Sequence, residues 1–196
     1  MSKTSKKELI LKTAKEHFAK FGYELTSLEK IAQDCNITKP AVYYYFKDKA
    51  SLYEAVLISE FELLAKEIVK SLEENTPQKQ LKSYIEIFGN FLVKNEDFSA
   101  LFARELASEG ANISDKALEI LTTTILTLSK ILEANSSFKN VNPFMIQLMI
   151  VSTLTNFNTT KDFRKRVSKI INKHQQKVDF ADIVSKLSDT ILKGLS

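Results

Sequence analysis

The chain has 196 residues, of which 44% are hydrophobic and 27% charged, a composition that excludes a disordered or fibrous protein. The low content of glycine (4 residues) and proline (3 residues) favours long helices, and the single cysteine fits a reducing cytoplasm. The sequence contains no run of about 18 apolar residues, so we expect no membrane span. The formal charge of +4 lies in residues 1–50, which contain 10 lysines and 6 acidic residues, and this fits either a polyanionic partner or a lysine-rich N-terminus that aids solubility.

The N-terminal apolar residues recur at helical spacing and predict a first helix from about Lys6 to Phe21. Charged residues interrupt the apolar stretches of this segment, so we expect no signal peptide. Gly22 follows at the position where a residue with left-handed backbone geometry commonly ends a helix.

A second, short helix is expected to begin after Thr26 and to end near Cys35. Residues 26–29 (Thr-Ser-Leu-Glu) have the pattern of a capping box, in which the Thr26 hydroxyl faces the third backbone amide and Glu29 reaches back. Residues 36–37 should form the turn that follows. The side chains that this helix should bury are Leu28, Ile31 and Ala32.

A third helix can be capped by Thr38 and ends near Phe46, and Pro40 is tolerated because it falls in the first turn. Thr38 and Lys39 stand at the start of this helix, where free backbone amides favour a phosphate group. Lys39 can also reach the acceptor edge of a guanine.

Three consecutive tyrosines occupy the second half of the third helix. Because successive helical residues are about 100° apart, we expect Tyr43 to pack partly inward and Tyr44 and Tyr45 to face outward. Their hydroxyls can bond phosphate oxygens, and their rings can contact thymine methyls and sugars. A tyrosine-rich contact with another protein is the alternative interpretation.

Three short helices before a long one match a helix-turn-helix unit, whose second helix crosses the DNA backbone and whose third lies in the major groove. The rest of the sequence predicts helices and no strand, so the fold class is all-α with about nine helices. We expect a helix-turn-helix DNA-binding domain in residues 1–50 and a larger helical effector-binding and dimerisation domain in residues 51–196. The later helices run from Asp48 to about Glu74, from Pro77 to beyond Leu92, from Glu96 to Ser108, from Ser114 to about Ala134, from Asn142 to beyond Leu154, and from Asp179 to about Leu195. A basic amphipathic segment from Lys161 to about Lys173 precedes the last of them.

Residues 8–56 resemble the N-terminal signature of the TetR family of bacterial transcriptional regulators. The residues that agree in type and spacing include Ala14, Phe18, Gly22, Tyr23, Thr26, Ser27, Leu28, Ile31, Ala32, Ile37, Thr38, Lys39, Val42, Tyr43, Tyr44, Tyr45, Phe46, Lys47, Asp48, Lys49 and Leu52. The resemblance implies contacts with double-stranded DNA from the start of the second helix, the recognition helix and the lysine before the long helix. These contact positions are Thr26, Ser27, Lys39, Pro40, Ala41, Tyr43, Tyr44, Tyr45 and Lys49. Tyr45 stands where histidine is frequent in the family.

A DNA reader of this kind usually binds a palindrome as a homodimer, with half-sites about one helical turn apart. The segment that begins at residue 144 is apolar nearly all round, and the last helix carries an apolar stripe. Both resemble the subunit interface of the family, although packing within one chain is the alternative. The expected interface residues are Phe144, Leu148, Val151, Phe180, Ile183, Val184, Leu187 and Ile191.

The resemblance also implies an internal pocket for a small-molecule effector. Aromatic residues could line it, although aromatic residues at helical spacing are more often ordinary core. The candidate pocket residues are Phe61, Phe88, Phe91, Phe98, Phe102 and Arg104.

Two further features carry no assigned function. Residues 161–177 contain seven basic residues and one acidic residue, which fits an anionic partner or, as we prefer, a solvated amphipathic helix. His17, His174 and Cys35 are too far apart in sequence to predict a tetrahedral metal site, and we expect no cofactor.

These patterns favour a homodimeric repressor that a small molecule releases from a palindromic operator. The alternative is an all-helical interaction module of the same fold without DNA binding. An enzyme is disfavoured, because the sequence shows no nucleophile–base pair, phosphate-binding loop or metal set.

Overall fold

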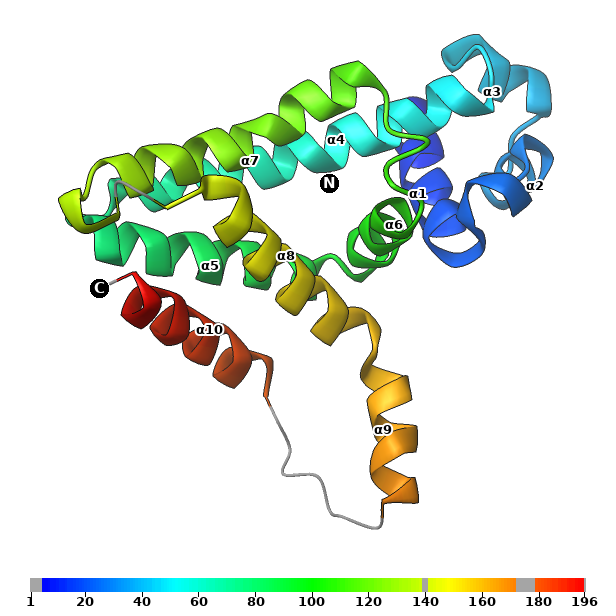
Figure 1. Cartoon of the computed structure of the whole chain (residues 1–196). Helices are drawn as coiled ribbons and strands as arrows, with labels where there is room; N and C mark the ends of the chain where they lie inside the picture. Colours follow the sequence, from blue (N-terminus) through cyan, green and yellow to red (C-terminus); the bar gives the residue numbers. More distant parts are fainter. Residues whose placement is uncertain (1–4, 139–140, 172–178, 196) are drawn as a thin grey trace. The chain divides into compact units, whose positions relative to one another are not determined.

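The computed structural model describes residues 5–138, 141–171 and 179–195, and within these ranges the chain is all-helical, as predicted (Figure 1). Two short 3-10 helices, η1 (Lys70–Glu73) and η2 (Ser136–Phe138), accompany the α-helices. The α-helices are α1 (Lys6–Leu25), α2 (Leu28–Asp34), α3 (Lys39–Tyr45), α4 (Lys49–Val69), α5 (Pro77–Lys94), α6 (Glu96–Ala107), α7 (Asp115–Glu133), α8 (Pro143–Thr159), α9 (Lys161–Ile170) and α10 (Phe180–Gly194).

The chain forms two compact units. The first contains residues 1–63 and 96–120. It therefore includes α1, α2, α3 and most of α4, together with α6 and the start of α7. The second contains residues 64–95 and 121–196. Neither unit ends at residue 50. The expected division into a DNA-binding domain (residues 1–50) and an effector-binding and dimerisation domain (residues 51–196) therefore stays a prediction about function.

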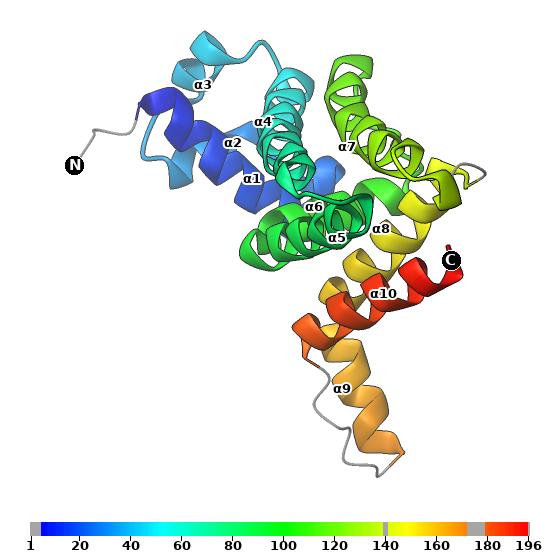
Figure 2. The same ribbon diagram turned by 90° about the vertical axis from the view of Figure 1, so that its left-hand side faces the viewer.

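In the first unit, α1 packs against α2 and α6 (Figure 2). Ile10, Ala14 and Phe18 of α1 are fully buried, because they recur on one face of the helix. Leu28, Ile31 and Ala32 of α2 are buried as predicted. The short helices are therefore held by side chains that meet in one core.

Gly22 bends the end of α1. Its φ of 78° and ψ of 173° lie in a region that side chains with a Cβ avoid, and the helix resumes to Leu25. The expected positive φ at Gly22 is confirmed, but its ψ lies outside the left-handed helical region, and the helical segment continues past the expected end at Phe21.

The predicted capping box at residues 26–29 is wrong by one residue. Ser27 is the capping residue of α2, and its Oγ accepts the backbone N–H of Lys30 at 3.2 Å. Thr26 is buried instead, and its hydroxyl donates to the Gly22 carbonyl oxygen at 2.7 Å. The hydroxyl thus closes the bend in α1, which leaves the cap to its neighbour.

Several predicted caps are confirmed, while α4 is shorter than expected. The Asp48 carboxylate accepts the Ser51 amide at 2.7 Å, and the Ser114 hydroxyl accepts the Ala117 amide at 3.3 Å. The α-helix ends at Val69, but the helical run continues as η1 to Glu73, so the expected end near Glu74 is confirmed for the run although its last turn is a 3-10 helix.

In the second unit, α10 packs on α5 and α8. A methyl group added at Gly89 of α5 would lie 2.9 Å from Cγ2 of Val184 and 3.0 Å from Cε1 of Phe180. Gly89 therefore permits the close approach of α10. Tyr84 of α5 is also buried, and its hydroxyl donates to the Gln147 side chain of α8 at 2.7 Å.

The α8 helix is buried on only one side within this chain. Ile146, Ile150 and Leu154 face the core, whereas the apolar side chains Phe144 and Leu148 are exposed. After α8 the chain turns at Thr160 into α9, which is shorter in the structure than the predicted basic segment. Lys173, the expected end of that segment, lies outside the described residues.

Candidate nucleic-acid interface

The α3 helix presents a tyrosine-rich face to solvent. Val42 and Phe46 are buried and attach the helix to the core of the first unit. Tyr43, Tyr44 and Tyr45 are 45%, 82% and 36% exposed. Tyr44 faces outward as predicted, but Tyr45 is less exposed than Tyr43, so the predicted difference between an inward Tyr43 and an outward Tyr45 is wrong.

The tyrosine rings form a defined surface rather than independent side chains. The rings of Tyr44 and Tyr45 meet edge to face, with centroids 4.9 Å apart. The ammonium group of Lys39 lies 5.8 Å from the centroid of Tyr43. An exposed array of aromatic rings and hydroxyls beside a lysine suits contacts with sugars, methyl groups and phosphate oxygens.

Lys39 is paired in the free protein. Its ammonium group donates to the carboxylate of Glu29 on α2, and both side chains are largely solvent-accessible. The hydrogen bond lowers the pKa of the Glu29 carboxyl and raises that of Lys39. The partners lie ten residues apart on two different helices, so the sequence pattern gave no sign of this pair.

Lys49 holds the end of α1. Its ammonium group donates to the carbonyl oxygens of Tyr23 at 2.9 Å and Glu24 at 3.2 Å, and it lies 4.4 Å from the Tyr23 ring centroid. A cation at the C-terminal carbonyls of a helix is electrostatically favourable. In this geometry Lys49 joins α1 to the start of α4.

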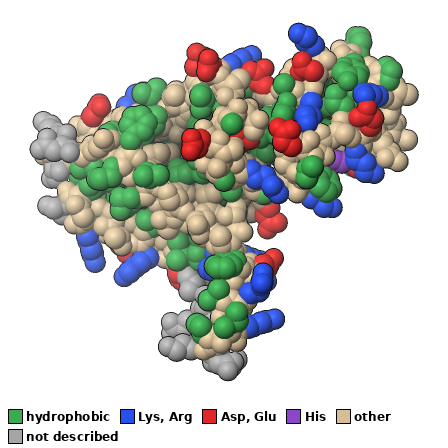
Figure 3. Space-filling view, turned by 45° about the vertical axis from the view of Figure 1, so that its right-hand side comes forward, with side chains coloured by type: hydrophobic (Ala, Val, Ile, Leu, Met, Phe, Trp, Pro, Cys, Tyr) green, Lys and Arg blue, Asp and Glu red, His purple; other side chains and the backbone are tan. Residues whose placement is uncertain are grey.

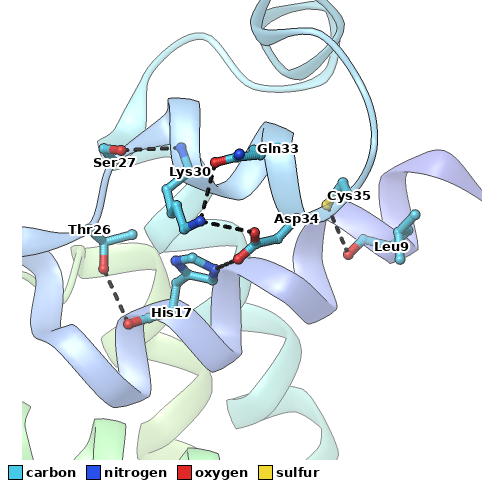
Figure 4. Close-up of polar contacts among 8 residues, drawn as sticks. All are labelled: Leu9, His17, Thr26, Ser27, Lys30, Gln33, Asp34 and Cys35. Carbon is cyan, nitrogen blue, oxygen red and sulfur yellow. Dashed lines mark hydrogen bonds and ion pairs between the residues drawn. The ribbon is translucent and has the colours of Figure 1, made fainter.

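A polar network fixes α2 against α1 (Figure 4). Nε2 of His17 lies 2.8 Å from Oδ2 of Asp34, and the hydrogen bond lowers the pKa of the Asp34 carboxyl. Nζ of Lys30 lies 3.4 Å from the other oxygen of Asp34. The sulfur of Cys35 lies 3.9 Å from the carbonyl oxygen of Leu9. These contacts hold the helix pair that carries α3.

The other predicted DNA-contact residues divide by exposure. Ser27, Thr38 and Pro40 are exposed, and Ala41 is half-buried. Thr26 is 3% exposed and its hydroxyl is bound to the backbone, so the structure corrects its predicted role from a DNA contact to a structural one. Thr38 precedes α3 but makes no side-chain cap.

The candidate effector residues fall in both units of the chain. Phe61, Phe98 and Phe102 pack together in the first unit, and the rings of Phe98 and Phe102 stack at 5.4 Å. Phe88 and Phe91 are buried in the second unit. This packing supports the ordinary-core interpretation.

Arg104 binds the backbone of α1. Its guanidinium group donates to the carbonyl oxygens of Ala19 and Lys20 on α1, each at 3.2 Å. An open cleft of about 440 Å³ in the first unit, near Ser51 and Glu54, is lined by none of the six candidate residues.

Sequence reasoning raised Glu105 only as a possible partner of Arg104, either toward a polar ligand or in a solvated pair, and did not predict that its carboxylate is buried. Glu105 accepts hydrogen bonds from the Tyr53 hydroxyl and, at 3.3 Å, from the backbone amide of Asn112. Burial, with the bond to Glu105, raises the pKa of Tyr53 far above its ordinary value. The network ties α4 and the α6–α7 loop to α6. Because its members lie 7 and 52 residues apart, no local pattern identifies it.

The expected dimer residues are of two kinds. Val151, Val184 and Ile191 are buried within this chain, and Phe180, Ile183 and Leu187 are half-buried. Phe144 and Leu148 of α8 are exposed and free to meet another molecule.

Within the ranges that the structure describes, no helix is long and apolar enough to cross a bilayer. No group of three or more metal-ligating side chains is found among the same residues, and His174 lies outside them.

Three comparisons place this geometry among known proteins. A family model described as "Bacterial regulatory proteins, tetR family" matches residues 10–56. The HTH-type transcriptional regulator RutR of Escherichia coli is 24% identical over 193 residues, which cover 98% of this chain and 91% of RutR.

Solved structures extend the likeness to the whole fold. A tetR-family regulatory protein from Rhodococcus has a TM-score of 0.77 at 19% identity, over 99% of this chain and 98% of that one. FadR of Bacillus subtilis, solved in complex with stearoyl-CoA, has a TM-score of 0.71 at 22% identity, over 95% of this chain and 96% of that one. These similarities show that the all-helical fold is one used by transcriptional regulators.

Proposed function

Because the chain belongs to the TetR family of helix-turn-helix transcriptional regulators, we propose that it binds a palindromic operator as a homodimer and represses transcription until a small molecule releases it. It would act in the cytoplasm, where its DNA is accessible. The observation that carries the proposal is the exposed face of α3, in which three tyrosines and Lys39 stand on a helix fixed by Val42 and Phe46.

The geometry of α3 fits the major groove. The helix is short, its apolar anchor residues point into the core, and its outward side chains combine hydroxyl groups, rings and a cation. Of the three tyrosines, Tyr44 is the most exposed, at 82%, so it offers the most surface to DNA. Lys49 and Thr26 bind backbone carbonyl oxygens at the end of α1 and so fix the part of the chain that precedes α2 and α3.

An electrophoretic mobility shift with genomic fragments at two salt concentrations tests DNA binding. Specific binding that weakens as salt rises supports the proposal, because phosphate contacts release counterions. Tyr44→Ala should weaken binding by roughly tenfold, within the range of one lost base or sugar contact. Phe163→Ala, an exposed aromatic residue on α9, is the matched control and should bind as the parent does.

The same experiment tests the alternative, an interaction module without DNA binding. Folded protein that retains no fragment at either salt concentration would favour that alternative. A reporter gene placed downstream of the retained fragment then separates repression from activation. Deleting the gene of a repressor raises reporter output, whereas deleting that of an activator lowers it.

The support for a ligand comes from FadR of Bacillus subtilis, whose structure with the same fold contains stearoyl-CoA. We infer that this chain also responds to a small molecule, and an acyl-CoA is the first probe to test. Release of the operator fragment by stearoyl-CoA, but not by free CoA, would support an acyl-chain effector. Lack of release by a broad set of metabolites would contradict the ligand-released mechanism while leaving DNA binding intact.

A further inference from the structure

The α9 helix is unusual in this protein because none of its ten residues is buried. Both ribbon views show it running away from α8 and α10, the neighbouring helices of its own unit (Figures 1 and 2). An isolated helix of this length is marginally stable in water. A partner that covers one face would therefore stabilise it.

The side chains of α9 separate into two faces. Phe163, Val167 and Ile170 follow the helical repeat, and Ile171 continues the apolar stripe just beyond the helix. Phe163 is 64% exposed and Ile170 is 82% exposed. Such a stripe on the surface commonly marks an interaction site.

Basic side chains border and back the apolar stripe. At 100° per residue, Arg166 lies on one edge of the stripe, and Lys161 and Lys169 lie on the opposite face. Lys165 lies on that face too, where it pairs with Asp162, the one acidic residue of the helix, at 3.2 Å. Figure 3 shows basic side chains along one edge of this projecting helix, beside hydrophobic ones.

The direction of α9 is set by a corner at the end of α8. The guanidinium group of Arg164 donates to the Phe157 carbonyl oxygen at 2.5 Å and to the Thr160 hydroxyl at 2.6 Å. It also lies 3.9 Å from the Phe157 ring centroid, and that ring packs against Phe180 of α10. The corner anchors the base of α9 and leaves its stripe uncovered.

The charges indicate which partner can cover the stripe. A second α9 would bring like charges together. The exposed face of α8 in a second copy offers apolar side chains such as Phe144 and Leu148 but no carboxylate. DNA would meet the lysines, but its phosphates would not cover Phe163 and Ile170. An anionic lipid surface satisfies both faces, with headgroups for the basic side chains and the acyl boundary for the apolar ones.

We propose that α9 binds the surface of membranes that contain anionic phospholipid, with Phe163, Val167 and Ile170 inserted and Arg166 and Lys169 against the headgroups. The helix lies in the plane of the surface and does not cross the bilayer. This contact is additional to DNA binding and uses no residue of α3.

A tryptophan reporter tests the insertion directly, because the chain contains no tryptophan. Phe163→Trp in the full-length protein should show a blue-shifted emission with vesicles of phosphatidylcholine and phosphatidylglycerol, and none with phosphatidylcholine alone. Leu126→Trp, at an exposed apolar position on α7, is the matched control and should not shift.

Vesicle co-sedimentation tests the charges. Arg166→Gln with Lys169→Gln should weaken partitioning to anionic vesicles by roughly thirtyfold, which corresponds to about 1 kcal/mol per basic residue. The double variant Phe163→Ser with Ile170→Ser should abolish partitioning to the same vesicles, because it removes the apolar side chains that insert. Because all four side chains are exposed or half-exposed, both double variants should fold and shift operator DNA as the parent does.

Three outcomes would overturn the proposal. The first is no partitioning of the parent protein to anionic vesicles. The second is equal partitioning of the parent and both double variants, which would place the lipid-binding surface elsewhere. The third is a change in oligomeric state of the variants without lipid binding by the parent, which would assign α9 to a second copy of the chain.

Discussion

Glu29 binds the ammonium group of Lys39 in this structure, so in the proposed DNA complex a phosphate would compete with this carboxylate for Lys39. The Lys39–Glu29 ion pair keeps the lysine oriented beside the Tyr43 ring. It also places a negative charge close to α3. At the scale of single residues, we therefore expect Glu29 to weaken the proposed DNA interface while it orders Lys39.

Glu29→Gln tests this balance. The substitution removes the competing charge, so operator affinity should rise several-fold, and the slope of log affinity against log salt should steepen by roughly 0.9 for one added phosphate contact. Fluorescence anisotropy across a salt series measures both quantities. Glu73→Gln, an exposed acidic residue of η1, is the control. An unchanged slope in Glu29→Gln would show that Lys39 does not contact phosphate.

The Asp34–His17 contact predicts a dependence of stability on pH. The hydrogen bond from His17 lowers the folded-state pKa of Asp34 below its ordinary value of 3.8. The contribution of the ionised group is therefore fully present above about pH 4 and is lost as the pH falls toward the folded pKa.

Asp34→Asn should lower the melting temperature by a few degrees at pH 7, and the difference from the parent should shrink below about pH 4. Circular dichroism melts between pH 7 and pH 3 measure the effect. A difference that stays constant over this range would contradict the assignment of the stabilisation to the Asp34 carboxylate.

Residue types and spacing were sufficient to predict that Tyr44 faces outward, but not that Tyr43 is more exposed than Tyr45. They were insufficient for Thr26, because a hydroxyl before a helix can cap that helix or turn back to the previous one. The Gly22 bend brings the Gly22 carbonyl within 2.7 Å of Thr26, and this decides the outcome. The Lys39–Glu29 pair likewise depends on the packing of α2 on α3.

At the scale of helices, Gly22 is the position on which the end of α1 depends. Its backbone angles are reached freely by glycine, while the nearest atom to an added Cβ, on Arg104, is at 3.6 Å. The cost of a side chain here is therefore backbone strain and not a clash.

Gly22→Ala should lower the free energy of unfolding by roughly 1–3 kcal/mol, the cost of holding a residue with a Cβ in this region. Gly194→Ala is the matched control, because Gly194 lies in the last turn of α10 and an added Cβ meets nothing within 4 Å. The control should be neutral or stabilised by up to about 1 kcal/mol. Urea denaturation of both variants measures the difference, and equal effects would contradict the role given to Gly22.

Helix starts were easier to predict than helix ends. Asp48, Ser114 and Asn142 cap their helices because an oxygen acceptor three residues or fewer from a free amide is a local interaction. The change of α4 into η1 after Val69 has no such local sign. The grouping of α6 with α1 also depends on contacts between distant segments, such as Arg104 with Ala19.

At the scale of the whole molecule, the apolar residues of α8 and α10 serve different purposes. The stripe of α10 meets α5 and α8, and Val184, Ser188 and Ile191 are buried within one chain. The sequence could not separate this use from a subunit contact, because both require the same apolar stripe. Exposed apolar side chains on α8 carry the stronger indication of a second subunit.

The proposed homodimer can therefore be tested on α8 without disturbing the core. Leu148 is 67% exposed, so Leu148→Glu should leave the single chain folded, whereas a charge at the half-buried Leu187 would also disturb the packing of α10. In a dimer that covers this face, the carboxylate would be buried without a partner. The dimer dissociation constant should rise by at least about thirtyfold, equivalent to about 2 kcal/mol.

Sedimentation equilibrium of Leu148→Glu measures this dissociation constant. The control is Leu126→Glu, at a leucine on α7 that is 59% exposed. The control should remain dimeric. Leu148→Glu should also lose binding to a palindromic operator but keep weak binding to a single half-site, because α3 is unchanged. A Leu148→Glu protein that sediments as a dimer would contradict an interface on this face of α8.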